Sequence, residues 1–239
     1  HEFMTVPPEA LVCAMRTHQK YFALTEKAGE LAPNFITISN MPSNSERDKT
    51  TISGNERVLS ARLSDAKFFW DQDRSAKLSS RIPALETIKF YDKLGTLGEK
   101  MVRVEALGVY LSQWVPGVDQ QSLKRATQLS KADLTTSMVG EFPELQGIMG
   151  SYFAHNDGEA NEICLAIKEH YSPQGPSDTC PTAALSVVVS LADKIDTLVG
   201  FFAINEKPSG SKDPFAVRRY ALSVIRLIRE NSLRLPLEK

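Results

Sequence analysis

Residues 183–203 read AALSVVVSLADKIDTLVGFFA and form one of the most apolar stretches of this 239-residue chain. A helix that is apolar on nearly every side is normally buried in a protein core. Asp193 and Asp196 lie inside the stretch, and a buried carboxylate is costly unless it is paired, bound to a metal or neutralised. The stretch therefore predicts a buried helix, and it raises the question of which group holds Asp193.

The bulk composition is that of an ordinary globular protein, with 42% hydrophobic and 24% charged residues. The net charge of −1 gives no general argument for nucleic-acid binding, so any basic site must be local. Three widely spaced cysteines without a CxxC motif favour a reducing compartment over a disulfide scaffold or a zinc site. We see no signal peptide, and charges interrupt the 183–203 stretch, so we expect a soluble cytoplasmic protein.

The chain divides into three parts by pattern. Residues 1–3, HEF before the first methionine, resemble a tag or cloning remnant. Residues 4–95 mix strand and helix patterns, whereas residues 96–239 show helical spacing throughout. The predicted fold class is α+β, mainly α, with a small mixed N-terminal region and a helical domain after it.

Individual elements follow from local signals. KYFALTE and NFITISN predict two strands, and residues 41–54 predict a polar loop before a helix at 55–73. Residues 120–139 predict one continuous helix. In the last helix, Asp213 is the expected N-cap, and Pro214 suits the first helical position.

Several histidines and aspartates on these helices are candidate ligands of a divalent metal that activates water. The candidates are Asp133, His155, His170, Asp193 and Asp196. A plainer interpretation stays open for two of them. His170 would be satisfied by a neighbour in the core, and Asp193 would bond helix-terminal amides or an arginine.

Basic residues concentrate at the end of the chain. Residues 207–239 hold eight lysines and arginines against three acidic residues, a local charge of +5. We expect Phe215, Leu222 and Ile225, with Val224 and Ile228, to face the core and the arginines to face solvent, where guanidinium groups can contact phosphates. The predicted phosphate contacts are Lys212, Arg218, Arg219 and Arg226. A charged helix face that is merely solvated remains the alternative.

Several long motifs resemble the β subunit of the two-chain bacterial glycyl-tRNA synthetase: MRTHQKYFAL, GNERVLSARLSDAKFFW, KADLTTSMVGEFPELQGIMG, LADKIDTLVGFF and PSGSKDPFAVRRYAL. The resemblance implies that a separate α subunit makes glycyl-adenylate, using ATP and magnesium, while the β subunit recognises tRNA. It implies an internal fragment that is not itself catalytic and has no cofactor of its own. The implied partners are the α subunit and glycine tRNA.

The resemblance also implies that the helical half is similar to HD-type phosphohydrolases. On that alignment Arg103 replaces the early histidine, Ala132-Asp133 replaces the His-Asp dyad, Asp193 is the late aspartate and His170 an accessory histidine. A cation in a ligand position repels metal and pairs with carboxylates. We therefore expect a degenerate site without metal, in which Asp193 bonds Arg103 or a nearby donor.

Two alternatives from other classes remain. One is an active metal-dependent phosphohydrolase, which stoichiometric metal in the purified protein would support. The other is an architectural body that only positions other domains or docks the α subunit, with FFW at 68–70 and HQKYF at 18–22 as the docking region.

Overall fold

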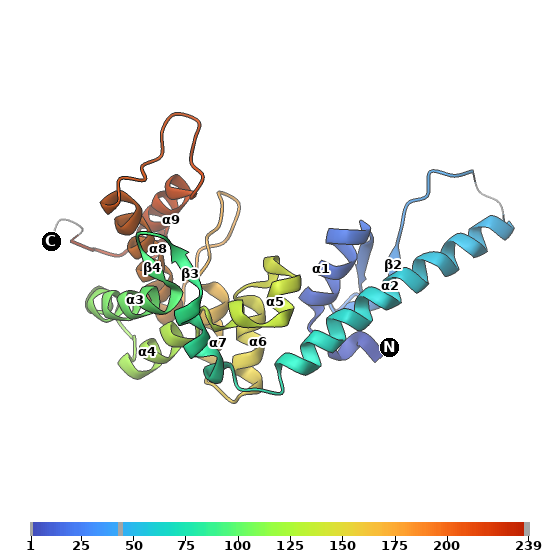
Figure 1. Cartoon of the computed structure of the whole chain (residues 1–239), viewed down its shortest axis with the longest axis horizontal. Helices are drawn as coiled ribbons and strands as arrows, with labels where there is room; N and C mark the ends of the chain where they lie inside the picture. The colour runs from blue at the N-terminus through green and yellow to red at the C-terminus, as the bar shows by residue number, and fades with distance from the viewer. Residues whose placement is uncertain (1, 43–44, 237–239) are drawn as a thin grey trace. The chain divides into compact units, whose positions relative to one another are not determined.

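The computed structural model describes residues 2–42 and 45–236 (Figure 1). The chain forms two compact units. The first comprises His1–Ala76 and Thr136–Leu145, and the second comprises Lys77–Thr135 and Gln146–Lys239. Residues 77–95 thus pack with the second unit, although the sequence grouped them with the N-terminal region. The predicted division at residue 95 marks where strand patterns end, and it stays a prediction about domain organisation.

The chain as a whole is mainly helical, as predicted, with two small antiparallel sheets among the described residues. In the first unit β1 (Phe22–Thr25) pairs with β2 (Leu31–Ile36). The first predicted strand, at 20–26, is confirmed, whereas β2 begins three residues before the second predicted strand, at 34–40, and ends at Ile36. Gly29 adopts a φ of 87° in the turn between them, a conformation that favours glycine. In the second unit β3 (Lys89–Tyr91) pairs with β4 (Gly95–Thr96).

The first unit is built on two helices, α1 (Pro8–Gln19) and α2 (Ser45–Asp73). The prediction of a polar loop at 41–54 was wrong, because α2 already begins at Ser45. The early turns of α2 lack an apolar stripe, and its buried residues occur only from Leu59 onward. A helix start without apolar periodicity cannot be told from a loop by pattern alone. A short helix, α5 (Ser137–Glu141), completes the unit.

The predicted N-terminal remnant does not stand apart in the structure. Residues Glu2–Thr5 form a 3₁₀ turn, η1, that packs near α2, while His1 lies outside the described residues. The fold therefore gives no support for treating residues 2 and 3 as separate from the rest of the first unit.

The second unit surrounds the long helix α8, which is buried as predicted and packs against α3, α4, α7 and α9 (Figure 1). Its helices are α3 (Leu97–Leu111), α4 (Gln120–Leu129), α6 (Ile148–Asn156), α7 (Asn161–Glu169), α8 (Ala184–Ala203) and α9 (Val217–Glu230). Short 3₁₀ turns, η2 (Leu78–Thr87), η3 (Ser112–Trp114) and η4 (Ala132–Thr135), connect them, and η5 (Pro143–Leu145) follows α5 in the first unit.

Two helix boundaries differ from the predictions for local chemical reasons. The expected helix at 120–139 breaks after Leu129, and Thr136 caps α5 by accepting a hydrogen bond from the Val139 amide at 3.2 Å. Helix α9 begins at Val217 rather than next to Asp213. The Asp213 carboxylate still accepts the Val217 amide at 2.8 Å, so it caps the helix from four residues away.

No helix among the described residues is both long and apolar enough to cross a membrane. The similarity of the second unit to HD-type domains stays a prediction.

Candidate functional site

The second unit contains a buried cluster of charged side chains, which we call the charge centre. Its members come from α3, the segment before η4, the end of α7, and α8: Lys100, Lys131, His170, Asp193 and Asp196. The helices meet because each carries an apolar face toward α8. The packing of these helices therefore buries the five side chains together, and their charges must be satisfied by one another or by nearby polar groups of the protein.

Asp193 is held by two lysines. Its Oδ1 lies 3.1 Å from the Lys100 ammonium, and its Oδ2 lies 3.2 Å from the Lys131 ammonium. Burial alone would raise the pKa of Asp193, but the positive charges of Lys100 and Lys131 outweigh it and hold the pKa well below the usual range. Asp193 is therefore an ionised carboxylate with an ammonium close to each oxygen, and its Oδ2 accepts a hydrogen bond from Lys131.

Lys131 sits between Asp193 and an imidazole. Its Nζ lies 2.8 Å from His170 Nε2 and 3.7 Å from the centre of the Tyr171 ring. His170 Nδ1 lies 2.7 Å from the Ile167 carbonyl, so we assign the ring proton to Nδ1 and the acceptor role to Nε2. Burial lowers the pKa of Lys131 to about 8, with the Asp193 charge opposing this effect. Burial and the Lys131 charge also hold the pKa of His170 well below its usual value.

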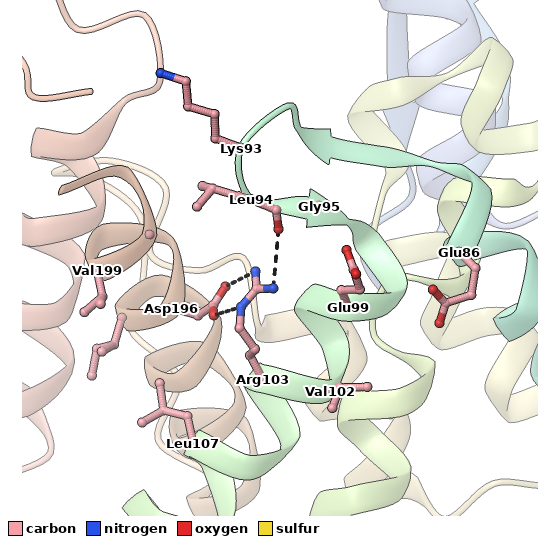
Figure 2. Close-up of a pocket in the computed structure, with 12 residues that line it drawn as sticks. Glu86, Lys93, Leu94, Gly95, Glu99, Val102, Arg103, Leu107, Asp196 and Val199 are labelled. Carbon is pink, nitrogen blue, oxygen red and sulfur yellow. Dashed lines mark hydrogen bonds and ion pairs between the residues drawn. The ribbon is translucent and has the colours of Figure 1, made fainter. Parts of the chain in front are cut away.

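Arg103 pairs with the other aspartate of α8. Its Nε lies 2.7 Å from Asp196 Oδ1, and it also donates to the Leu94 carbonyl at 3.4 Å (Figure 2). The hypothesis that Asp193 bonds Arg103 was therefore wrong in that partner, while its alternative of a nearby donor is confirmed by Lys100 and Lys131. Arg103 lines an open pocket of about 840 Å³ between α3, α8 and the β3–β4 turn.

Asp133 serves a different part of the unit. Its Oδ2 accepts the Gly147 amide at 2.6 Å and the Gly150 amide at 3.0 Å, so it caps the start of α6. Burial raises its pKa to about 6, and the two amides oppose this rise. A Cβ on Gly150 would lie 3.0 Å from the same oxygen, so a side chain at this position would crowd the carboxylate of Asp133, and glycine leaves room for it. The neighbouring Ala132 is fully buried.

Sequence reasoning missed the three lysines of this region. Lys194 is the third: its ammonium donates to the carbonyls of His170, Tyr171 and Ser172 at 2.8–3.1 Å and to Ser190 Oγ at 2.8 Å. It thereby ties the end of α7 to α8. The available signal was a lysine inside the most apolar stretch of the chain, a place where an ammonium is found only when it has partners.

The donor set does not fit a divalent metal. The Lys131 ammonium lies within hydrogen-bond distance of both His170 and Asp193, and a second ammonium occupies the other oxygen of Asp193. Two ammonium groups repel a metal cation and consume the lone pairs that would bind it. Among residues 2–42 and 45–236, no group of three or more His, Cys, Asp or Glu side chains is arranged as a metal site. His155, another candidate ligand, is exposed at the end of α6.

The predicted phosphate contacts divide into two groups. Lys212, Arg218 and Arg219 are exposed on the α8–α9 loop and the first turn of α9. Arg226 is instead engaged locally: it pairs with Glu230 at 2.8 Å and donates to the carbonyls of Gly175 and Asp178 at 2.8 and 2.9 Å. Arg226 thus fastens the loop after α7 to α9.

The predicted core face of α9 was partly wrong. Phe215 stacks on Phe201 with ring centres 4.5 Å apart, as a core residue should. Leu222 and Ile225 are instead 61% and 51% exposed. The face of α9 that packs inward carries the buried Val217, Val224 and Leu227 together with Ser223, whose hydroxyl donates to the Pro173 carbonyl at 2.7 Å. Val224 thus lies in the core as predicted, whereas Leu222 and Ile225 lie outside the buried face.

A pH dependence of stability is expected from His170. Since its native pKa is depressed, the unfolded chain binds a proton below about pH 6.5 and the native protein does not, so stability falls as pH drops from 7 to 5.5. His170→Gln keeps an acceptor for Lys131 without titrating. As pH drops, the free energy of unfolding of the wild type should fall by up to about 1.4 kcal/mol per pH unit more than that of this variant. Thermal unfolding at several pH values measures the difference. An equal pH dependence of the wild type, His170→Gln and the exposed-site control His155→Gln would contradict this assignment.

Comparison with known proteins identifies the family. The family described as "Glycyl-tRNA synthetase beta subunit" matches residues 1–239. The chain is 54% identical over 236 residues to the glycine–tRNA ligase β subunit of Rhodospirillum centenum, covering 98% of this chain and 33% of that protein. The β subunits of Phenylobacterium zucineum and Dinoroseobacter shibae are 49% and 48% identical over 240 residues, covering 99% of this chain and 36% and 33% of theirs.

The chain thus spans about a third of the length of the curated relatives that it matches. A full-length match to the family description, together with identities near 50%, settles membership. The chain belongs to the glycyl-tRNA synthetase β-subunit family.

Proposed function

We propose that this chain acts as a tRNA-binding and assembly portion of glycine–tRNA ligase and is not catalytic by itself. In this proposal a catalytic α subunit supplies the chemistry with ATP and magnesium, and glycine tRNA is the substrate. The observation that carries the tRNA part is a set of exposed cations at one junction, Lys212, Arg218 and Arg219. These side chains have the charge and exposure that phosphate contacts need.

An exposed aromatic ring supports the same surface. Phe202, at the end of α8, is 49% exposed, and the Lys207 ammonium lies 6.0 Å from its ring centre. Proteins that bind unpaired nucleotides combine cations with aromatic rings on which bases stack. We therefore define the basic surface as Phe202, Lys207, Lys212, Arg218 and Arg219.

Two features close to the basic surface contribute less to the proposed RNA binding. The Asp213 carboxylate accepts the amides of Val217 and Arg218 at 2.8 and 2.9 Å, so the start of α9 does not offer these donors to a phosphate. Arg226 is engaged with Glu230 and loop carbonyls. We therefore place the proposed contacts on the basic surface and not on Arg226.

Assembly with the α subunit is proposed for the first unit. Phe22 and Phe68 are 55% and 63% exposed there, while Trp70 of the same FFW motif is buried. Exposed apolar side chains mark a protein contact site when they form one patch, and in this proposal Phe22 and Phe68 contribute to such a patch. An architectural role would keep this docking and lack the RNA affinity. The phosphohydrolase alternative is disfavoured, because ammonium groups occupy the oxygens of Asp193.

Titration with glycine tRNA at two salt concentrations tests the RNA proposal. We expect Lys212→Glu with Arg219→Glu to weaken binding by at least about 100-fold, since each charge-assisted contact contributes about 1.5–3 kcal/mol. The dependence of log K on log salt should become shallower by about 0.7–0.9 per lost contact.

The matched control reverses the same number of charges elsewhere, at the exposed Lys77 and Lys124. It should change tRNA affinity much less than the double variant of the basic surface. Equal losses in the two variants would mean that only net charge matters. Absence of any binding by the wild type would move recognition to other parts of the ligase.

A further inference from the structure

Helix α9 carries an exposed apolar stripe that no residue of the described structure covers. Leu222 and Ile225 are 61% and 51% exposed, and the spacing of four, three and four residues from Arg218 to Arg229 places all four side chains on one face. We call Arg218, Leu222, Ile225 and Arg229 the α9 stripe. Its centre is apolar, and an exposed arginine stands at each end.

The chemistry of the stripe restricts what can cover it. Two large aliphatic side chains contribute little to a phosphate backbone, which is recognised by cations and hydrogen-bond donors. A second copy of the same stripe would bring arginines toward arginines, and like charges across an interface are unfavourable. The complementary surface is therefore a protein segment with apolar side chains opposite Leu222 and Ile225 and a carboxylate opposite Arg229.

The size of the stripe points to an intramolecular partner. A stable interface between separate proteins uses roughly 20–30 residues on each side, whereas the stripe offers four. A small contact suffices when both surfaces belong to one chain, since the effective concentration is then high. The related β subunits are about three times as long as this chain. In a full-length β subunit, the remaining two thirds of the polypeptide could supply such a segment.

We infer that the α9 stripe is the docking face for an acidic amphipathic segment from another part of the full-length β subunit. The contact buries Leu222 and Ile225 and pairs Arg229 with a carboxylate, while Arg218 stays with the basic surface. It fixes the position of the second unit within the subunit through α9. This inference rests on family membership and does not depend on tRNA binding.

Hydroxyl-radical footprinting of a full-length β subunit containing these residues tests the inference directly. We expect oxidation of Leu222 and Ile225 to be several-fold slower in the full-length subunit alone than in the 239-residue chain. Protection that appears only after adding the α subunit, or only after adding glycine tRNA, would overturn the intramolecular assignment. Equal oxidation in the short and long chains under all conditions would also overturn it.

Substitutions add a second measurement with a matched control. Leu222→Gln with Ile225→Gln should leave the melting temperature of the 239-residue chain unchanged and lower that of the full-length subunit by about 2–4 °C. Arg229→Glu should restore oxidation of Ile225 in the full-length subunit, whereas Arg234→Glu, an exposed change outside the helix, should not. Restoration by both would indicate a general charge effect and contradict a defined acidic partner.

The two apolar residues of the stripe can be altered without touching Lys212 or Arg219. Full-length subunits carrying Leu222→Gln and Ile225→Gln should therefore keep their salt-dependent affinity for glycine tRNA. If the unaltered full-length subunit protects Leu222 and Ile225 but does not bind glycine tRNA, the proposed function alone fails. If it binds glycine tRNA but leaves Leu222 and Ile225 unprotected, the docking inference alone fails.

Discussion

Replacing Lys131 with methionine should lower the free energy of unfolding by about 3–5 kcal/mol, the range found when one partner of a buried ion pair is removed. The ammonium contacts Asp193 and His170 at 3.2 and 2.8 Å in a site that is almost fully buried. Its loss leaves Asp193 paired with Lys100 alone and leaves the His170 acceptor without its donor. Urea unfolding monitored by circular dichroism measures the change.

The exposed Lys124 provides the control, because Lys124→Met removes the same charge without removing a buried contact. We expect this variant to stay within about 0.5 kcal/mol of the wild type. Combining Lys131→Met with Asp193→Asn should cost less than the sum of the single changes, since the second change removes the carboxylate that lost its partner. Additive losses would contradict direct coupling between the two side chains.

The charge centre also shows how far sequence reasoning reached. The apolar character of residues 183–203 predicted a buried helix, and a buried aspartate required a partner, so the need for a nearby cation could be derived. The identity of that cation could not. Arg103 and Lys100 lie one turn apart on α3, and only the packing of α3 against α8 determines that Lys100 reaches both Asp193 and Asp196 while Arg103 reaches Asp196.

Other differences have equally local causes. The early part of α2 has no buried side chain before Leu59, so hydropathy carries no helical signal there. Leu222 and Ile225 look like core residues by hydropathy, yet Val217, Val224 and Leu227 form the buried face of α9, so Leu222 and Ile225 face outward. Hydropathy predicts that an apolar side chain will be buried, but it does not say whether this chain or another protein segment buries it.

Replacing Asp133 separates a capping role from a metal-binding role. Asp133→Ala removes the acceptor of two buried amides, Gly147 and Gly150, and each buried donor left unsatisfied costs about 1–3 kcal/mol. We therefore expect a loss of about 2–5 kcal/mol in the free energy of unfolding. Asp133→Asn keeps one oxygen for both amides and should retain most of the stability.

The pH dependence distinguishes Asn from Asp at this position. The native pKa of Asp133 is raised to about 6 from an ordinary value near 4, so the stability that its proton contributes is present at low pH and is lost as pH rises through 6. Relative to Asp133→Asn, the wild type should therefore become less stable between pH 4.5 and 7. A metal ligand would behave differently: Asn would then resemble Ala, and both variants would abolish any stabilisation by added divalent metal. Chemical unfolding at both pH values, with and without manganese, decides between the two roles, because only a cap at α6 makes Asn the milder change in the absence of metal.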